Sequence, residues 1–207
     1  MNRKLNISYY TAKKMLMELL ANDKLLEDEE IKKILKKMAL QSGKTNICIK
    51  KTPIIIDTQC RLFFPMYSDK EVKMSYLPKT VYIFFLLHHT GVEFKNLDSY
   101  TKELYQIYQI VSEEKNIEAG KIKKSLSNLV APGNNRIYEI CSVVRRSLSE
   151  ILPTELVAQY AITGKWGGLH KIKAERSLLE IKHIKLRACL NFVQQHSYCS
   201  KFHHLLC

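Results

Sequence analysis

The spacing of apolar side chains divides the chain into two helical regions with an extended region between them. From Ser8 to Leu40, apolar residues at three- and four-residue spacing predict two helices. Residues 46–56 and 61–67 are instead rich in β-branched and aromatic side chains, and we expect residues 71–74 to add a short strand. We therefore expect a helical N-terminal extension followed by a small antiparallel sheet.

The next stretch predicts a helix that is buried on all sides. Residues 80–87 are apolar at almost every position, Pro78 suits the first turn of a helix, and Gly91 suits the left-handed residue beyond a helix end. Val92 to Phe94 then forms an extended link. Beyond it, a helical stripe of apolar residues predicts a linking helix, and residues 112–128 predict a further short one.

An amphipathic basic helix followed by a glycine-rich hairpin is the most distinctive combination in the chain. From Asn135 to Ile151, apolar residues fall on one helical face and leave Arg145 and Arg146 on the other. Pro153 ends this helix. Glycines within Tyr160 to Lys173 permit the positive dihedral angles of a tight turn, so this segment predicts a β-hairpin.

Composition and charge narrow the class of partner. The chain has 207 residues, is 46% hydrophobic and carries a formal net charge of +13, so we expect a folded protein whose surface attracts polyanions. No apolar run approaches the roughly 20 residues that a membrane-spanning helix needs. The N-terminus lacks the apolar core and cleavage site of a signal peptide. These features predict a cytoplasmic protein without membrane contact.

Four segments, taken in order, carry a resemblance to a known family. The run from Ile54 to Lys79 joins an extended region to a Leu-Pro-Lys helix start, and Leu86 to Phe94 is a Leu-Leu pair followed by a glycine and an apolar step. Ile137 to Leu148 is the helix with the arginine pair, and Tyr160 to Ile172 is the hairpin. This order resembles the winged-helix effector domain of response-regulator transcription factors of the OmpR/PhoB type, over about residues 47–173.

The resemblance implies an α+β fold of the winged helix-turn-helix type, with a small N-terminal antiparallel sheet and helical extensions at both ends. We expect residues 1–44 to form the N-terminal extension, residues 45–174 the winged-helix-like domain, and residues 175–207 a C-terminal helix and tail, helical from about Glu175 to Gln195. The chain departs from the family at Val143, where the family commonly has an arginine, and in a longer connection between Asn96 and Gly133.

The implied function is binding of double-stranded DNA as a transcriptional or mobile-element regulator, without a cofactor. The helix over residues 135–151 would enter the major groove, where arginine grips guanine or phosphate in a bidentate manner, and hairpin 160–173 would act as the wing. The alternative for the arginines is a solvent-exposed face paired with Glu139 and Glu150, and for Trp166 a position folded onto the core. The candidate DNA-binding residues are Asn135, Arg136, Tyr138, Ser142, Arg145, Arg146, Lys165, Trp166, Lys171 and Lys173.

Two other classes of function remain open at this point. The first is a protein-interaction or assembly module that keeps the winged architecture and pairs with a partner protein or a second copy through its terminal helices. The second is an enzyme, which we do not expect because no catalytic set has a recognisable context, with a nuclease of dispersed acids as the exception. No metal is expected, and Cys199 with His203 is only a weak zinc candidate, because the paired Cys-x-x-Cys knuckle is missing.

Overall fold

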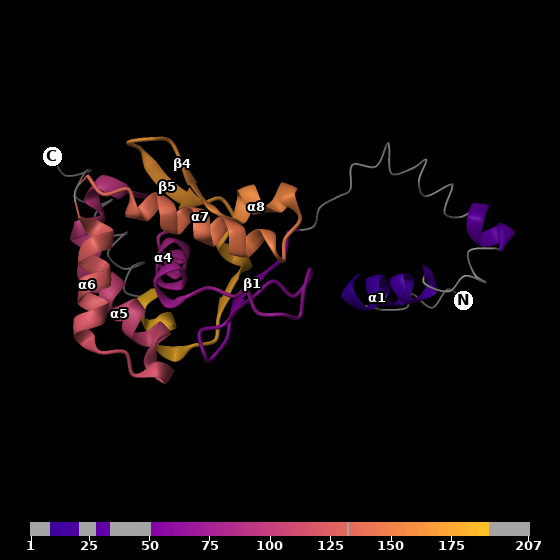
Figure 1. Ribbon diagram of the computed structural model, residues 1–207, viewed down its shortest axis with the longest axis horizontal. Coiled ribbons are helices and arrows are strands. Elements are labelled where there is room, and N and C mark those ends of the chain that lie inside the picture. The colour runs from indigo at the N-terminus through magenta and orange to yellow at the C-terminus, as the bar shows by residue number, and fades with distance from the viewer. Residues whose placement is uncertain (1–8, 21–27, 34–50, 132, 191–207) are drawn as a thin grey trace, which may run out of the picture.

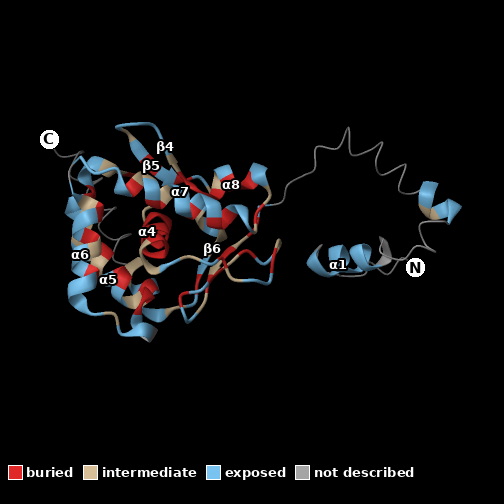
Figure 2. Cartoon of the chain, in the orientation of Figure 1, coloured by how far each residue is buried: buried red, intermediate tan, exposed pale blue. Residues whose placement is uncertain are grey.

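The computed structural model describes residues 9–20, 28–33, 51–131 and 133–190 (Figure 1). Helix α1 (Tyr9–Leu20) confirms the first predicted helix, and residues 29–33 are helical as well. The rest of the segment from Ser8 to Leu40 lies outside the described residues. Residues 10–18 of α1 are all exposed to solvent, as Figure 2 shows.

The centre of the fold is helix α4 (Tyr76–Leu87), which confirms the predicted buried helix. Every residue from 78 to 87 is buried, because other elements pack on all sides of this helix. Pro78 lies in its first turn, where a missing backbone N–H costs little. Gly91 has a φ of +98°, the left-handed conformation expected beyond the helix end.

The helices around α4 each bury one apolar stripe. After the 3₁₀ helix η1 (Phe94–Tyr100) come α5 (Thr101–Val111), α6 (Ala119–Val130) and α7 (Arg136–Ser149), with a short 3₁₀ turn η2 (Glu113–Lys115) between the first two. Helices α5 and α7 pack on α4, and α6 bridges them. The predicted linking helix, short helix and amphipathic helix are therefore confirmed, with α7 ending two residues earlier than expected.

The first sheet differs from the prediction in its third strand. Strands β1 (Ile54–Ile56) and β2 (Leu62–Phe63) are antiparallel as expected, but β6 (Leu179–Ile181) pairs with β1 in parallel. Residues 71–74 form no strand, although the Val72 N–H donates to the Leu62 carbonyl at 2.8 Å. The small sheet is thus mixed rather than antiparallel.

The prediction of a last helix from Glu175 is wrong over its first residues. The 3₁₀ turn η3 (Arg176–Leu178) leads directly into β6, and helical structure begins only at residue 184 and continues to the last described residue, 190. The backbone pairs with β1 explain the difference, since they satisfy peptide groups of both strands. Residues 191–195 lie outside the described part of the chain.

The second sheet contains the predicted hairpin. Strands β4 (Ile162–Gly164) and β5 (Leu169–Ile172) are antiparallel, and β3 (Val92–Glu93) pairs with the other edge of β5, giving the order β3-β5-β4. The hairpin begins later than predicted because an additional helix, α8 (Thr154–Tyr160), precedes it. Pro153 was expected to end α7, but α7 ends four residues earlier, at Ser149, and Pro153 is the N-cap of α8.

Tyr160 was expected in the hairpin and is instead the last residue of α8, where it anchors the core. Its hydroxyl donates to the Thr52 carbonyl and accepts from the Thr52 N–H, both at 2.7 Å. The Tyr82 hydroxyl donates to the Tyr160 carbonyl at 3.0 Å. This buried network ties the chain before β1 to α4 and to α8.

The architecture is α+β, as predicted, with helices around α4 and two small three-stranded sheets. Within the described ranges, no helix has the length and apolar character needed to span a bilayer.

Candidate nucleic-acid interface

Helix α7 presents the predicted polar face to solvent. Its buried side includes Ile137, Ile140, Val144 and Leu148. The candidate residues on the helix lie elsewhere on its surface, since all are exposed except Tyr138, which is half-buried. The amphipathic pattern of the sequence therefore predicted which side of α7 faces the core and which side faces solvent. The exposed candidates at this helix are Asn135, Arg136, Ser142, Arg145 and Arg146.

The arginines of α7 differ in their partners. Arg136 Nη1 lies 2.6 Å from Glu139 Oε2 in an exposed ion pair. In the described part of the chain, Arg145 and Arg146 take part in no ion pair, and neither does Glu150. The interpretation of a solvent face paired with acids thus holds for the first arginine alone. The other two guanidinium groups keep their hydrogen-bond donors available to an outside ligand.

The turn of the hairpin lies against α7 through its tryptophan. The Trp166 ring stacks on the Tyr138 ring with centroids 5.1 Å apart and planes 13° apart. Trp166 nevertheless remains 82% exposed, so it is neither folded into the core nor detached from the protein. The stack therefore fixes the tip of the hairpin beside the exposed face of the helix.

The basic residues of the hairpin face solvent. Lys165 precedes the turn, Lys171 alternates with buried neighbours along β5, and Lys173 follows the strand. All three are exposed, and no ion pair holds any of them within the residues that the structure describes. Their ammonium groups can therefore meet an external anion without breaking an internal contact.

Two further rings continue the aromatic contacts from the surface inward. Phe94 stacks on His170 with centroids 3.6 Å apart, and Tyr138 meets Phe94 edge-on at 5.1 Å. His170 Nδ1 lies 2.9 Å from the Gly168 carbonyl, and desolvation lowers the pKa of this histidine. A neutral His170 therefore donates from Nδ1 to that carbonyl and holds the hairpin turn to the ring cluster.

Helix geometry places Arg145 on the same flank as the hairpin contact, whereas Arg146 projects about 100° farther around the helix. Arg145 follows Tyr138 by seven residues, which is close to two turns, so both side chains leave the helix in nearly the same direction about 10 Å apart. In Figure 1 the hairpin lies beside the N-terminal half of α7, and α8 lies at its other end. Helix and hairpin thus contribute to one surface.

A cavity of about 370 Å³ opens where the hairpin turn meets the start of α7. Sequence reasoning missed it, because it depends on the loop between α6 and α7 approaching η1 and the hairpin in space. The aromatic signal was present in Phe94 and Tyr138, but their spacing in the chain does not show that they meet. The lining residues include Phe94, Lys95, Asp98, Asn135, Tyr138, Trp166 and His170.

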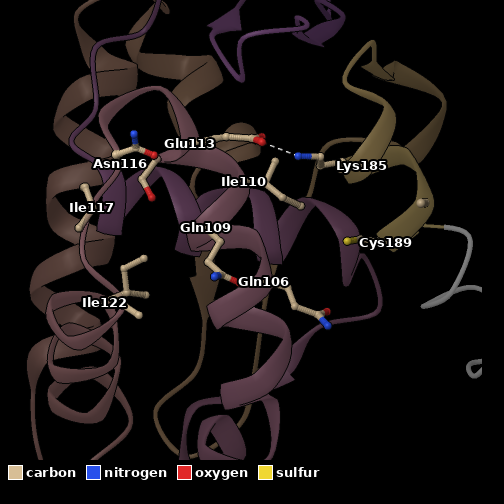
Figure 3. A pocket seen from close by; sticks show the side chains of 12 residues that line it. Gln106, Gln109, Ile110, Glu113, Asn116, Ile117, Ile122, Lys185 and Cys189 are labelled. Atoms are coloured by element: carbon tan, nitrogen blue, oxygen red, sulfur yellow. Dashed lines mark hydrogen bonds and ion pairs between the residues drawn. The ribbon is translucent and has the colours of Figure 1, made fainter.

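A larger cavity of about 640 Å³ lies between α5, the start of α6 and the helix that begins at residue 184 (Figure 3). Glu113 and Lys185 form an ion pair of 2.5 Å at this cavity. Burial raises the pKa of the Cys189 thiol there, so the thiol is protonated at neutral pH and is a poor nucleophile. None of the residues that line this cavity belongs to α7 or to the hairpin.

The remaining side chains that could take part in catalysis have partners within the protein. His88 Nε2 contacts both carboxylate oxygens of Glu103, at 2.9 and 3.0 Å, whereas Glu93 pairs with Lys95. The acid that pairs with His88 is therefore Glu103, and Glu93 is engaged by a lysine. Burial raises the pKa of Cys141, on α7, to about 12.

No cluster of three or more potential metal ligands occurs among the described residues. The weak zinc candidates Cys199 and His203 lie outside them.

The chain matches no protein-family model, no curated protein and no solved structure.

Proposed function

We propose that the protein binds duplex DNA, with α7 in the major groove and the β4–β5 hairpin along the neighbouring backbone as a wing. The stack of Trp166 on Tyr138 carries the proposal, because it brings the hairpin tip to the exposed flank of a basic helix. Five basic side chains on this surface have no internal ion-pair partner among the described residues: Arg145, Arg146, Lys165, Lys171 and Lys173.

The shape of the surface suits a duplex. An α-helix fits the major groove of B-DNA, and the 14 residues of α7 span about 21 Å. The pairing of β3 with the hairpin supports a winged-helix architecture, because it fixes the wing to the segment that follows the central helix. Arginine forks match guanine edges and phosphates in a bidentate manner, whereas lysine ammonium groups bind phosphates as point charges. The helix would therefore supply specificity, and the wing would supply affinity.

A salt series of DNA titrations tests the proposal. Fluorescence anisotropy of labelled random and selected duplexes gives the dissociation constant at each salt concentration. We expect a log–log slope steeper than about −4, since each neutralised phosphate contributes about −0.9. The double variant Arg145→Ala, Arg146→Ala should flatten the slope by about 1.8 if both side chains contact phosphate.

The matched control removes two positive charges elsewhere. Lys123 and Lys124 are exposed on α6, away from the proposed surface, so their double alanine variant should keep the wild-type slope. A slope and a dissociation constant that are both unchanged in the arginine variant would remove the two arginines from the interface. Equal losses in both double variants would indicate attraction by net charge, without a defined site.

The second candidate function is an assembly module that does not bind DNA. The exposed apolar side chains of α1, Met15, Leu16 and Met17, favour it, because several large apolar side chains exposed on one short helix commonly mark a contact with a partner. Ile184, at the start of the last described helix, is 80% exposed. Leu178 and Leu179, which were expected in the C-terminal helix, lie instead in η3 and β6. A dimeric mass by light scattering, together with no DNA binding, would favour this function.

A further inference from the structure

The cavity between the hairpin turn and the start of α7 has walls of a distinctive chemistry. Four aromatic rings contribute to it, in two parallel stacks that meet edge-on: Trp166 on Tyr138, and Phe94 on His170. Its volume of about 370 Å³ falls within the range of roughly 300–1,000 Å³ that is typical of small-ligand sites. The walls therefore suit a flat aromatic group.

The polar side chains that line the cavity offer hydrogen-bond donors and acceptors, and their charges sum to zero. Lys95 and Asp98 are one base and one acid, and the ammonium of Lys95 is already held by Glu93 at 3.1 Å. Asn135 is the N-cap of α7, yet its side chain makes no capping hydrogen bond. Asn134 Oδ1 instead accepts from the Arg136 N–H at 2.9 Å. The amide of Asn135 is therefore available to a ligand with a hydrogen-bonding edge.

The outer ring of the aromatic cluster is exposed to an unusual extent. Trp166 is 82% exposed although it is the only tryptophan of the chain and tryptophan is on average a well-buried residue. Its contact with Tyr138 holds the ring at the cavity instead of leaving it free on the turn. A fixed, exposed ring beside a cavity is a stacking platform, which nucleobases use without strong sequence preference.

From this geometry we infer that the cavity binds a nucleobase. A base is planar, uncharged and edged with donors and acceptors, which matches four rings, an available amide and a balanced acid and base. A phosphate lacks the flat apolar surface, and a hydrocarbon would leave the polar groups without partners. The base comes either from a free nucleotide or from an unpaired position in bound DNA, and the second source rests on the proposed function.

The sole tryptophan provides the measurement. Stacking of a base quenches indole fluorescence, so the emission of Trp166 is followed while each of the four nucleoside 5′-monophosphates is added, with ribose 5-phosphate as the control without a base. In the second arm, the emission of Trp166 is followed while a duplex with one unpaired 2-aminopurine is added, and is compared with its emission on addition of the same duplex fully paired. Saturable quenching by a nucleotide identifies a free nucleotide as the source. A response of the unpaired duplex alone identifies bound DNA as the source.

Variants separate a base pocket from general attraction. With 2-aminopurine as the reporter, Trp166→Ala should weaken base binding by roughly 5- to 150-fold, the range measured for loss of one stacking ring. The exposure of Trp166 means that the variant should keep the fold, which a thermal melt verifies. Leu169→Ala is the matched control, since Leu169 is also exposed on the hairpin but does not line the cavity.

Three results would overturn the inference: no saturable quenching in either arm, an equal response to ribose 5-phosphate, or unchanged base binding in the tryptophan variant. Anisotropy of the fully paired duplex is recorded in parallel. Binding of this duplex without binding of a base in the cavity would refute the nucleobase site and would support the proposed DNA surface. Binding of nucleotides without binding of the duplex would sink the DNA surface and leave the pocket intact.

Discussion

Replacement of Tyr160 by phenylalanine should destabilise the protein out of proportion to the loss of one oxygen atom. The hydroxyl satisfies both backbone groups of Thr52, which is fully buried, so its removal leaves a buried N–H and a buried carbonyl without that partner. An unsatisfied buried N–H costs about 1–3 kcal/mol, and a carbonyl about 1 kcal/mol, so we expect a loss of about 2–4 kcal/mol. The ring contact with Phe64, at 5.2 Å, is retained.

The assay is chemical unfolding of wild type and variant, together with a thermal melt. For a chain of this size, the expected loss lowers the melting temperature by about 5–15 °C. Tyr105→Phe is the matched control, because its hydroxyl accepts one long bond of 3.4 Å from Gln109 on an exposed helix face, and it should change stability by less than about 0.5 kcal/mol. If Tyr160→Phe were as mild as this control, the hydroxyl would not anchor the segment before β1.

Two more predictions concern the hairpin. Gly164→Ala should destabilise the protein by about 1–3 kcal/mol, since a new Cβ would lie 2.5 Å from the Leu169 carbonyl oxygen. The control Gly120→Ala, in open space on α6, should stabilise the protein by about 0.5 kcal/mol. Equal urea midpoints for the two variants would contradict the close approach at Gly164. Burial lowers the folded-state pKa of His170 below 6.5, so its contribution to stability is full above pH 6.5 and is lost as the pH falls toward the folded pKa. The melting temperature should therefore drop between pH 7.5 and 5.5. His170→Asn should reduce that drop without abolishing it, because burial also lowers the pKa of His183. An unchanged drop in the variant would exclude His170 as a source of the pH dependence.

Local pattern was enough to predict helices α4 to α7 of the core, whereas the short helix α8 was missed. Helix α4 was predictable because ten consecutive buried residues leave no polar face, and α7 because its apolar residues recur at helical spacing. Strand β6 was not predictable from its own residues, because Leu178, Leu179 and Ile181 fit a helical stripe as well as a strand. Only the backbone of β1, far away in the chain, decides between the two structures.

The candidate surface was predictable only where its features lie within a single helix or turn. The outward direction of Arg145 and Arg146 followed from helical periodicity, and the turn of the hairpin followed from its glycines, of which Gly167 alone adopts a positive φ, at +70°. The contact between Trp166 and Tyr138 did not follow, because it depends on how α8 turns the chain back toward α7. The aromatic cavity was missed for the same reason. Contacts within one element follow from the sequence, and contacts between elements require the packing.

The parallel pairing of β1 with β6 has a consequence for biosynthesis. Ile54 lies opposite Leu179, so 125 residues of polypeptide separate the two partners. A nascent chain exposes the unpaired edge of β1 until residues 179–181 have left the ribosome, and closure of so long a loop slows folding. Arrest of translation before residue 179 would release a chain whose first sheet consists of a bare two-stranded ribbon, the kind of unpaired edge that recruits other strands into aggregates.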